Sequence, residues 1–465
     1  MTYLLDVKQV CELEAFICQE KNVTLAELMK LAGTAVWHQL KRAYGGTPKS
    51  MVFFLGSGHN AGDGLVCAQM AINAGVDVYL YPVKPIKADL TQSLVNDLKM
   101  VFKSAWIEDV SQLQVDVAVD AMLGIGFTGE LSTEIQEGIC RFNQLNAFKV
   151  AIDIATGINA DSGYGEYYCQ VDHTITFFAA KIGHYFAQGR SASKSLIVAL
   201  RQFHDGSGYH CIDEEKLPKI PAHLHKYQRG LVAVISGEQS MQGAGVMAAE
   251  AALYTGAGLV VIHALTPLHR QIHPAIMVHD YTEAGINQCV NHHAVCLVGP
   301  GMGEGEKQAT IMQYLLSRDL SLVIDAQAIK HLPLNIKLES PCVLTPHIGE
   351  AAYLLNTTTH YVLNHPIEAA LNIQRRYHAA VILKGSATVI AMNEQVVLMT
   401  SGSVALATAG SGDVLAGIVT GLIAQHGLSL DVLQAAVLQH ANRAQAWEKI
   451  SRYPMVATDL YLTRT

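Results

Sequence analysis

The spacing of apolar residues divides the first half of the chain into segments of two kinds. Short, continuous apolar runs predict buried strands, at residues 51–55, 76–83, 115–123, 148–154, 171–178 and 196–200. Apolar residues that recur with helical spacing predict helices between them, at residues 5–44, 65–74, 90–103 and 134–145. Strands that alternate with helices are typical of a parallel sheet covered on both faces.

A segment between residues 204 and 229 interrupts the alternation. It is rich in polar residues, glycine and proline, and we interpret it as a connection between domains. The pattern then resumes, with strands at 230–236, 258–264, 294–299, 320–326 and 380–384, a strand and turn at 342–350, and helices at 243–255 and 411–424. The halves share no residue-level repeat. The sequence therefore predicts two different α/β domains, 1–210 and 229–465, joined by a linker at 211–228.

Composition narrows the class of protein. A chain of 465 residues exceeds one ordinary core, and a hydrophobic share of 50% with 15% charged residues predicts a large buried interior. The net charge is -8 and no Lys/Arg cluster is present, which argues against nucleic acid and anionic membranes as partners.

The same features indicate where the protein resides. No apolar run approaches the roughly 20 residues that span a membrane, and the first residues do not resemble a signal peptide. Nine cysteines without a CxxC pair indicate reduced thiols rather than a disulfide framework or a zinc site. We therefore expect a soluble, cytoplasmic protein.

The richest candidate for chemistry is the stretch from Thr408 to Gly417. Its glycines form a turn before a helix, and a helix N-terminus offers free N–H groups and partial positive charge to a phosphate. Gly410 and Gly412 would let the backbone approach a ligand. Asp413 would repel a phosphate, so we interpret it as a base that takes a proton from a hydroxyl. The alternative is an ordinary first-turn aspartate stabilised by the helix dipole.

Two further features of the second half point to a ligand. Lys384 begins a turn of small residues at a strand end, which suits a nucleotide phosphate or ribose, although an ordinary hairpin turn would look the same. His347 follows Thr345 and Pro346, and is either a ligand contact or a surface turn residue.

In the first half, polar residues gather at expected strand ends. A glycine-rich loop at 56–64 follows the first strand, as in phosphate-binding loops, although it matches the NAD fingerprint weakly and could be a tight turn. Asn60, Asp120, Asp153 and Thr156 lie at or just past strand ends. Their oxygens could hold a hard cation or a sugar, and each alone could equally be a cap.

Together these motifs resemble a known family. The first half resembles the NAD(P)H-hydrate epimerase domain, a Rossmann-like αβα sandwich, through GSGHNAGDG, DAMLGIG, DIATGINADSG and HTITFFAAKIG. The second half resembles the ADP/ATP-dependent NAD(P)H-hydrate dehydratase, a ribokinase-like αβα domain, through MQGAGVMAAEAALYTGAGLV, VGPGMG, LTPHIGEAAYLL, ILKGSAT and TAGSGDVLAGIVTGLIAQ. The motifs cover nearly the whole chain, in the order of the bifunctional repair enzymes.

The resemblance implies an activity. Hydrated NADH and NADPH cannot donate hydride, and this family restores them. The first domain interconverts the R and S epimers of the hydrate, and the second dehydrates the S epimer at the expense of ADP, which gives AMP and phosphate. The resemblance further implies potassium in the first site, magnesium with the nucleotide, and self-association into a homo-oligomer.

It also implies residue roles. Potassium would bind Asn60, Asp120 and Thr156. The hydrated dinucleotide would contact His59, Asn60, Ala61, Gly62 and Asp63 and the loop formed by Gly124, Ile125, Gly126, Phe127, Thr128, Gly129 and Glu130, with Asp153 as a catalytic residue beside the ring. In the second domain Ala244, Gly303 and His347 would contact the hydrate. Lys384, Gly385, Ser386, Ala387, Thr388 and Gly412 would hold the nucleotide, and Asp413 would act at the substrate hydroxyl.

The chain departs from the family pattern at four positions. His59 and Ala61 stand in the loop usually written NNGGDG, and Ala155 replaces the proline of DIPSG. Gln327 replaces an acid of DADAL. Two other readings stay open: a ribokinase-like small-molecule kinase, and a first half that binds nucleotides without catalysis.

Overall fold

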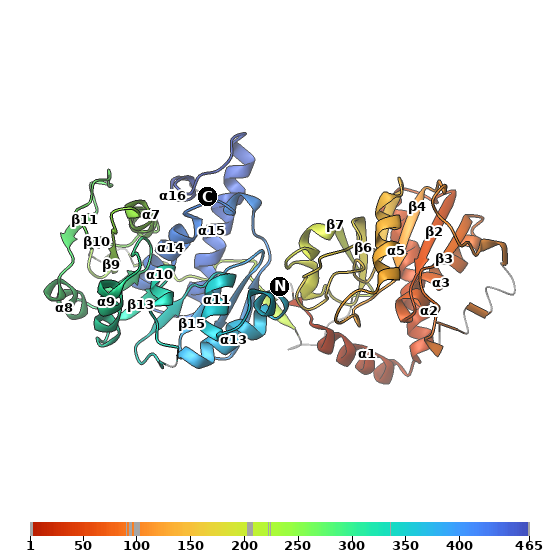
Figure 1. Ribbon diagram of the computed structural model, residues 1–465, viewed down its shortest axis with the longest axis horizontal. Coiled ribbons are helices and arrows are strands. Elements are labelled where there is room, and N and C mark those ends of the chain that lie inside the picture. The colour runs from red at the N-terminus through yellow and green to blue at the C-terminus, as the bar shows by residue number, and fades with distance from the viewer. Residues whose placement is uncertain are drawn as a thin grey trace. The chain divides into compact units, whose positions relative to one another are not determined.

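The computed structural model describes residues 3–89, 91–92, 95–96, 103–201, 208–221, 223, 225–334 and 336–463. The described chain forms two compact units, which divide between Tyr209 and His210 (Figure 1). Each contains a largely parallel sheet with helices, and the two sheets differ in strand order, so the predicted class of two different α/β domains is confirmed.

The N-terminal unit begins with a short strand and two helices, β1 (Tyr3–Leu4), α1 (Val7–Lys21) and α2 (Leu25–Tyr44). The prediction of one helix over residues 5–44 was therefore wrong. Asn22 ends α1 in the left-handed conformation, with φ 50°. Thr24 then caps α2, and its hydroxyl oxygen accepts from the Glu27 N–H in a capping box.

The sheet of this unit is parallel throughout, in the order β3-β2-β4-β5-β6-β7. Its strands are β2 (Ser50–Leu55), β3 (Asp77–Pro82), β4 (Val117–Ala121), β5 (Phe148–Ile152), β6 (Val171–Phe177) and β7 (Ser193–Ala199). The remaining helices are α3 (His59–Asn73), α5 (Thr133–Gln144), α6 (Gly189–Ala192) and two 3-10 turns at Lys103–Ala105 and Ile182–His184. The helix expected at 90–103 lies mostly outside the described residues.

Alternation along β2 explains the three layers. Met51, Phe53 and Leu55 belong to a core cluster with residues of α2 and α3. Val52 and Phe54 face the opposite side and cluster with residues of α5. A strand that is apolar on both faces must be covered on both, which is what its continuous apolar run predicted.

The sheet of the C-terminal unit runs β8-β17-β16-β15-β14-β13-β12-β9-β10-β11. The strands from β15 to β11 are parallel, whereas β15, β16 and β17 pair antiparallel. Their bounds are β8 (Tyr209–Cys211), β9 (Leu231–Ser236), β10 (Leu259–Ala264), β11 (Met277–Asp280), β12 (Val295–Val298), β13 (Ser321–Ile324), β14 (Cys342–Leu344), β15 (Ala380–Leu383), β16 (Thr388–Met392) and β17 (Gln395–Met399). The sequence did not predict β8, β11, β16 or β17.

Helices cover this sheet, and the central pair packs through small residues. A Cβ on Gly417 would lie 2.2 Å from the Ala248 carbonyl oxygen, so α14 and α7 approach as closely as backbones can. The helices are α7 (Gln242–Tyr254), α8 (Glu283–Asn291), α9 (Glu306–Leu316), α10 (Gln327–Lys330), α11 (Ile348–Leu355), α12 (Thr359–Asn364), α13 (Pro366–Tyr377), a 3-10 turn at Val404–Leu406, α14 (Ser411–His426), α15 (Leu430–Ile450) and α16 (Asp459–Leu462). Among the described residues, none of the helices has the length and apolarity that a membrane span requires.

Candidate active sites

The glycine-rich stretch of the C-terminal unit opens helix α14, as predicted. Gly410 takes the left-handed conformation, with φ 90°, and provides no side-chain cap for the first turn. The imidazole of His440 donates from Nε2 to the Ser411 carbonyl over 3.0 Å, and burial lowers the pKa of His440 to about 4, so this ring is neutral. Asp413 lies in the first turn, where a carboxylate also benefits from the helix dipole.

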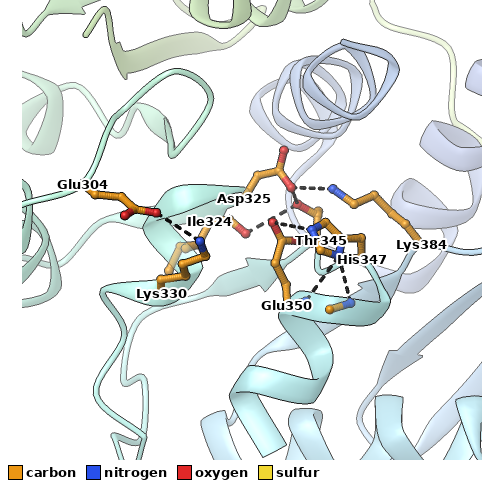
Figure 2. Close-up of polar contacts among 9 residues, drawn as sticks. Glu304, Ile324, Asp325, Lys330, Thr345, His347, Glu350 and Lys384 are labelled. Atoms are coloured by element: carbon orange, nitrogen blue, oxygen red, sulfur yellow. Dashed lines mark hydrogen bonds and ion pairs between the residues drawn. The ribbon is translucent and has the colours of Figure 1, made fainter. Parts of the chain in front are cut away.

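Lys384 lies beside this helix start. Its Nζ atom is 2.6 Å from Oδ1 of Asp325, which directly follows β13 (Figure 2). A Cβ on Gly412 would lie 3.4 Å from the same Nζ. The Thr345 hydroxyl donates to Asp325 Oδ1 over 2.7 Å. Three adjacent parallel strands, β13, β14 and β15, therefore bring one lysine, one acid and one hydroxyl together at their carboxyl ends.

Asp413 titrates unusually in this setting. Burial raises the pKa of its carboxyl to about 6, the charges of Asp325 and Glu350 add to the shift, and Lys384 opposes it. Burial alone would lower the pKa of Lys384, but the charges of Asp325 and Glu350 outweigh it and raise the pKa. The site thus holds a permanent cation beside an acid that exchanges its proton close to neutrality.

His347 has a local structural role. Its Nδ1 accepts from the Gly349 N–H over 2.9 Å, and the backbone N–H of His347 donates to the Glu350 carboxylate over 2.8 Å. His347 therefore caps helix α11 (Figure 2). The side chain is 60% exposed, and its backbone pairs with that of Lys384. A turn role and a ligand role are therefore compatible at this position. The helix after His347 was predicted only as a turn.

The loop after β12 reaches the same edge of the sheet. A Cβ on Gly299 would lie 1.7 Å from the Asp325 carbonyl oxygen, and one on Gly303 would lie 2.9 Å from Cγ of Glu238. Ala244 lies in the first turn of α7, next to Gly245, which packs on Ser236 at the end of β9. These contacts bring the predicted hydrate-binding residues to the edge that carries Asp325.

The turn from Lys384 to Thr388 joins the antiparallel strands β15 and β16, so it is a hairpin turn whose first residue carries the ion pair. Gly385 and Ser386 are exposed, and Ala387 is buried. Gln327 begins α10, and its Oε1 is buried without a hydrogen-bond partner among the described residues.

In the N-terminal unit, Asp120 is buried at the end of β4 and bound tightly by Thr156. The Thr156 hydroxyl donates to Oδ1 and its N–H to Oδ2, both over 2.7 Å. Burial raises the pKa of Asp120, and these hydrogen bonds oppose the shift. The Asn60 amide donates to the Leu123 carbonyl over 2.9 Å, and the Leu123 N–H donates to the Thr156 hydroxyl. The backbone of Leu123 therefore links Asn60 to Thr156, which in turn binds Asp120.

These donors suit a hard, weakly held cation. They are an amide oxygen, a carboxylate and a hydroxyl, next to a main-chain carbonyl, which is the oxygen-only chemistry that such ions prefer. No group of three His, Cys, Asp or Glu side chains able to hold a metal occurs among the described residues.

Asp153 lies beside this cluster in a strained conformation. Its φ is 66°, in the left-handed region that side chains other than glycine rarely adopt. The Lys181 ammonium lies 2.6 Å from its Oδ1, and the Thr176 hydroxyl donates to the same oxygen over 2.9 Å. Burial alone would raise the pKa of Asp153, but Lys181 and these hydrogen bonds lower it. Asp153 is therefore a carboxylate in this structure.

Lys181 is a site residue that the sequence did not single out. It is 1% exposed and also donates to Thr176 and to the Phe177 carbonyl. His184 completes the arrangement: its Nδ1 accepts from the Lys181 N–H and its Nε2 donates to the Asp153 carbonyl over 2.9 Å. Burial lowers the pKa of His184 to about 4. The available signal was a lysine among apolar residues just past the end of a buried strand, since β6 ends at Phe177.

The remaining predicted ligand residues of this unit lie at the start of α3 and in the loop from Gly124 to Glu130. Asp63 lies in the first turns of α3, and burial followed by the charges of Asp153 and Glu14 raises its pKa well above the usual range. Ala61 and Gly62 are buried, and His59 is exposed. The segment from Gly124 to Glu130 forms a half-buried to exposed loop, whose start contacts Asn60.

Each unit thus gathers polar side chains at the carboxyl ends of parallel strands, which is where α/β enzymes typically bind their ligands. Residues 232–464 match the family model of NAD(P)H-hydrate dehydratase, and residues 25–183 match that of the YjeF-related protein N-terminus. The chain belongs to the family of bifunctional NAD(P)H-hydrate repair enzymes, as the motifs predicted.

Its relatives match along nearly their full length. The bifunctional NAD(P)H-hydrate repair enzyme of Coxiella burnetii is 31% identical, over 99% of this chain and 98% of that protein. The enzyme of the same description from Escherichia coli K12 is 30% identical, over 95% of this chain and 89% of that protein. A solved Bacillus subtilis ADP/ATP-dependent NAD(P)H-hydrate dehydratase, co-crystallised with ATP and Mg2+, is 26% identical over 53% of this chain and 91% of its own, with a TM-score of 0.47.

Proposed function

We propose that the C-terminal unit dehydrates the S epimer of NADH and NADPH hydrate with ADP, and that the N-terminal unit interconverts the R and S epimers. The observation that carries the first half is Asp413. It is an acid whose pKa burial raises to about 6, in the first turn of a glycine-opened helix and in the field of Lys384. That combination suits a base for a hydroxyl that attacks a phosphate.

The chemistry follows from the poor leaving ability of hydroxide. Asp413 takes the proton of the hydrate hydroxyl, and the oxygen attacks the terminal phosphorus of ADP. The bond to AMP breaks, and Lys384 with the N–H groups of Gly412 and its neighbours balances the charge on the transferring group. The phosphorylated oxygen then leaves as phosphate while the adjacent carbon loses a proton, and the ring double bond forms again.

The nucleotide would lie along the turn from Lys384 to Thr388 and the start of α14, with Ala244, Gly303 and His347 on the side of the hydrate. Magnesium in such sites is held by one or two carboxylates and by the phosphates themselves, and it neutralises phosphate charge. Asp325 and Glu350 are the carboxylates in reach of Lys384 and Asp413. They fit that role together with a bound nucleotide.

For the N-terminal unit we infer a site in which Asn60, Asp120 and Thr156 hold potassium. The ion would supply a fixed positive charge for the hydrated dinucleotide. Asp153 and Lys181 supply a base and an acid in direct contact. Removal of the hydroxyl proton by the base lets the carbon–nitrogen bond of the hydrated ring break to an aldehyde while the acid protonates the nitrogen, and closure on the other face with both protons returned gives the other epimer. Residues 59–63 and 124–130 would line the ligand. We further propose a cytoplasmic homo-oligomer.

The test uses the full-length protein and an R/S mixture of NADPH hydrate, with ADP, magnesium and potassium. Nicotinamide absorbance should recover completely. The Asp413→Asn protein should recover none of it, yet it should bind ADP and still equalise the R and S epimers, followed by chromatography. Asp153→Asn should recover only the S fraction faster than spontaneous epimerisation.

Other outcomes would overturn the proposal. Wild-type turnover by Asp413→Asn would exclude Asp413 as the base. A stable phosphorylated product without recovery of absorbance would identify a small-molecule kinase. Unchanged epimer ratios in the wild-type protein, despite dinucleotide binding, would reduce the N-terminal unit to a binding module.

A further inference from the structure

A second group of reactive side chains lies in the C-terminal unit, away from Asp413. His263 belongs to β10 and Cys296 to β12, the two strands that flank β9. His263 pairs with Ile235 of β9, and Cys296 pairs with Ala233 of the same strand. Two residues apart on one strand is the same face of a sheet. The imidazole and the thiol therefore project to one side.

Helix α8 covers that side and supplies a second thiol. Sγ of Cys289 lies 3.4 Å from Nε2 of His263, and the Cys296 thiol hydrogen-bonds to the same sulfur. Cys289 thus contacts both His263 and Cys296, and the three residues come from three separate elements.

One atom of this cluster has no partner. Nδ1 of His263 is buried and makes no hydrogen bond within the part of the chain that the structure describes. A Cβ on Gly285 of α8 would lie 3.3 Å from it, so this glycine leaves room for the ring against the helix. A buried nitrogen left unsatisfied is costly. The other ring nitrogen, Nε2, is the one in contact with Cys289.

The two thiols are unequal. The hydrogen bond from Cys296, with His263 also in contact, lowers the pKa of the Cys289 thiol to about 5 against the effect of burial. The pKa of Cys296 is raised, first by the same hydrogen bond and then by burial. Cys289 retains 6% exposure and Cys296 none. Cys289 is therefore the sulfur that a small reagent reaches as a thiolate.

We propose that Cys289 and Cys296 form a reversible oxidation site that closes to a disulfide with a peroxide. The Cys289 thiolate attacks one oxygen of hydrogen peroxide, the O–O bond breaks, and the leaving hydroxide takes up the proton that the Cys289 thiol had released, which gives a sulfenic acid and water. The Cys296 sulfur then attacks Cys289, and the hydroxyl leaves as water with the Cys296 proton. Each sulfur loses one electron, and both peroxide oxygens end as water.

The position of this pair connects it to the proposed dehydratase site. Three residues after Cys296, strand β12 leads into the Gly299–Gly303 loop, which packs against the backbone of Asp325. A disulfide would fasten that strand to α8. Oxidation would therefore act on an element that supports the C-terminal site.

The test is peptide mapping of the folded, full-length protein after limited treatment with hydrogen peroxide. Thiols that remain are blocked with an alkylating reagent before digestion without reductant. We expect a linked 289–296 peptide to form on the order of tenfold faster than modification of the exposed thiols Cys11 and Cys140, and a dithiol to reverse it.

Variants separate the steps. Cys296→Ser should leave a sulfenic acid on Cys289 that dimedone traps, His263→Phe should slow the linkage on the order of tenfold, and Cys342→Ser, a buried thiol of the same sheet, should change nothing. Reaction at Cys11 and Cys140 while Cys289 and Cys296 stay reduced would overturn the proposal. So would linkage of Cys289 to any cysteine other than Cys296.

Discussion

Asp153 is buried and Asp413 half-buried, each near a lysine, yet their pKa values move in opposite directions. Lys181 bonds Asp153 directly, and its charge outweighs burial. Lys384 instead bonds Asp325, so Asp413 receives a cation at longer range and two like charges as well. The choice of partner by each lysine decides which acid exchanges protons near neutral pH.

A pH profile should reveal this at Asp413. The base must be ionised, so kcat/KM for dehydration should fall as pH drops through about 6, approaching tenfold per pH unit below it. Rates in short assays over pH 5 to 8 would measure this. A rate that stays constant throughout this range would contradict the assignment.

Glu350→Gln provides the control, because ADP itself can titrate in this range. Glu350 raises the pKa of Asp413 through its charge, so its neutral form should move the acid limb to lower pH. A limb set by ADP would not move. An unmoved limb in Glu350→Gln would exclude Asp413 as its source.

Lys181→Met should abolish epimerisation and destabilise the N-terminal unit. The change leaves Asp153 buried without its cation, which costs about 3–5 kcal/mol when a buried pair is broken. Denaturation by urea would measure the loss. The double variant Lys181→Met, Asp153→Asn should recover much of the stability without activity. Equal losses in both variants would show that packing, not charge, is responsible.

The sequence found some of these residues and missed others for a physical reason. Asp413 was identifiable because its glycines are its neighbours in sequence. Lys181 lies 28 residues from Asp153, and only the fold brings them together. Glu350 was read as part of a turn, although its spacing from His347 is that of a helix cap.

At the scale of elements, α7 and α14 depend on small residues. Gly417→Val would force atoms into the Ala248 carbonyl, 2.2 Å from the Cβ position. We expect a loss of roughly 1–3 kcal/mol in unfolding free energy, with weaker ADP binding because the start of α14 moves.

Gly243→Ala is the matched control for this contact. It lies in α7 with nothing within 4 Å of its Cβ position, so stability should be unchanged or slightly higher. Urea denaturation and ADP titration of both variants would decide. Equal effects would mean that helix propensity, not the contact, matters.

Element prediction succeeded where burial is complete on both faces. Continuous apolar runs identified the central strands of both sheets. The strands β8, β11, β16 and β17 were missed. The first two are short and carry polar residues, YHC and MVHD, so they have no such run. The strands β16 and β17 do contain short apolar runs, VIAM and VVLM, which were overlooked. The false single helix at the start arose because helical spacing continues across Asn22 and Thr24, whose capping roles were overlooked.

At the scale of the molecule, each compact unit carries its own candidate site on its own sheet. Replacing potassium with a bulky organic cation should therefore slow epimerisation by at least about tenfold, the size of loss seen when a metal site is disturbed, and leave dehydration of purified S hydrate unchanged. Chromatography of the epimers and absorbance recovery would measure the two separately. A parallel loss of both activities would contradict independent sites.

Lys384 is a single cation for which Asp325 and a bound phosphate would compete. It is bound to Asp325 and lies over Gly412, where a phosphate would arrive. A phosphate that binds the Lys384 ammonium would weaken the ion pair between Lys384 and Asp325. The Asp325 carboxylate would then attract a divalent ion more strongly. By thermodynamic linkage, a divalent ion bound at Asp325 would in turn strengthen the binding of phosphate at Lys384. Nucleotide and magnesium would then bind cooperatively. The ion pair between Lys384 and Asp325 would weaken the binding of either one alone, because each must compete with it.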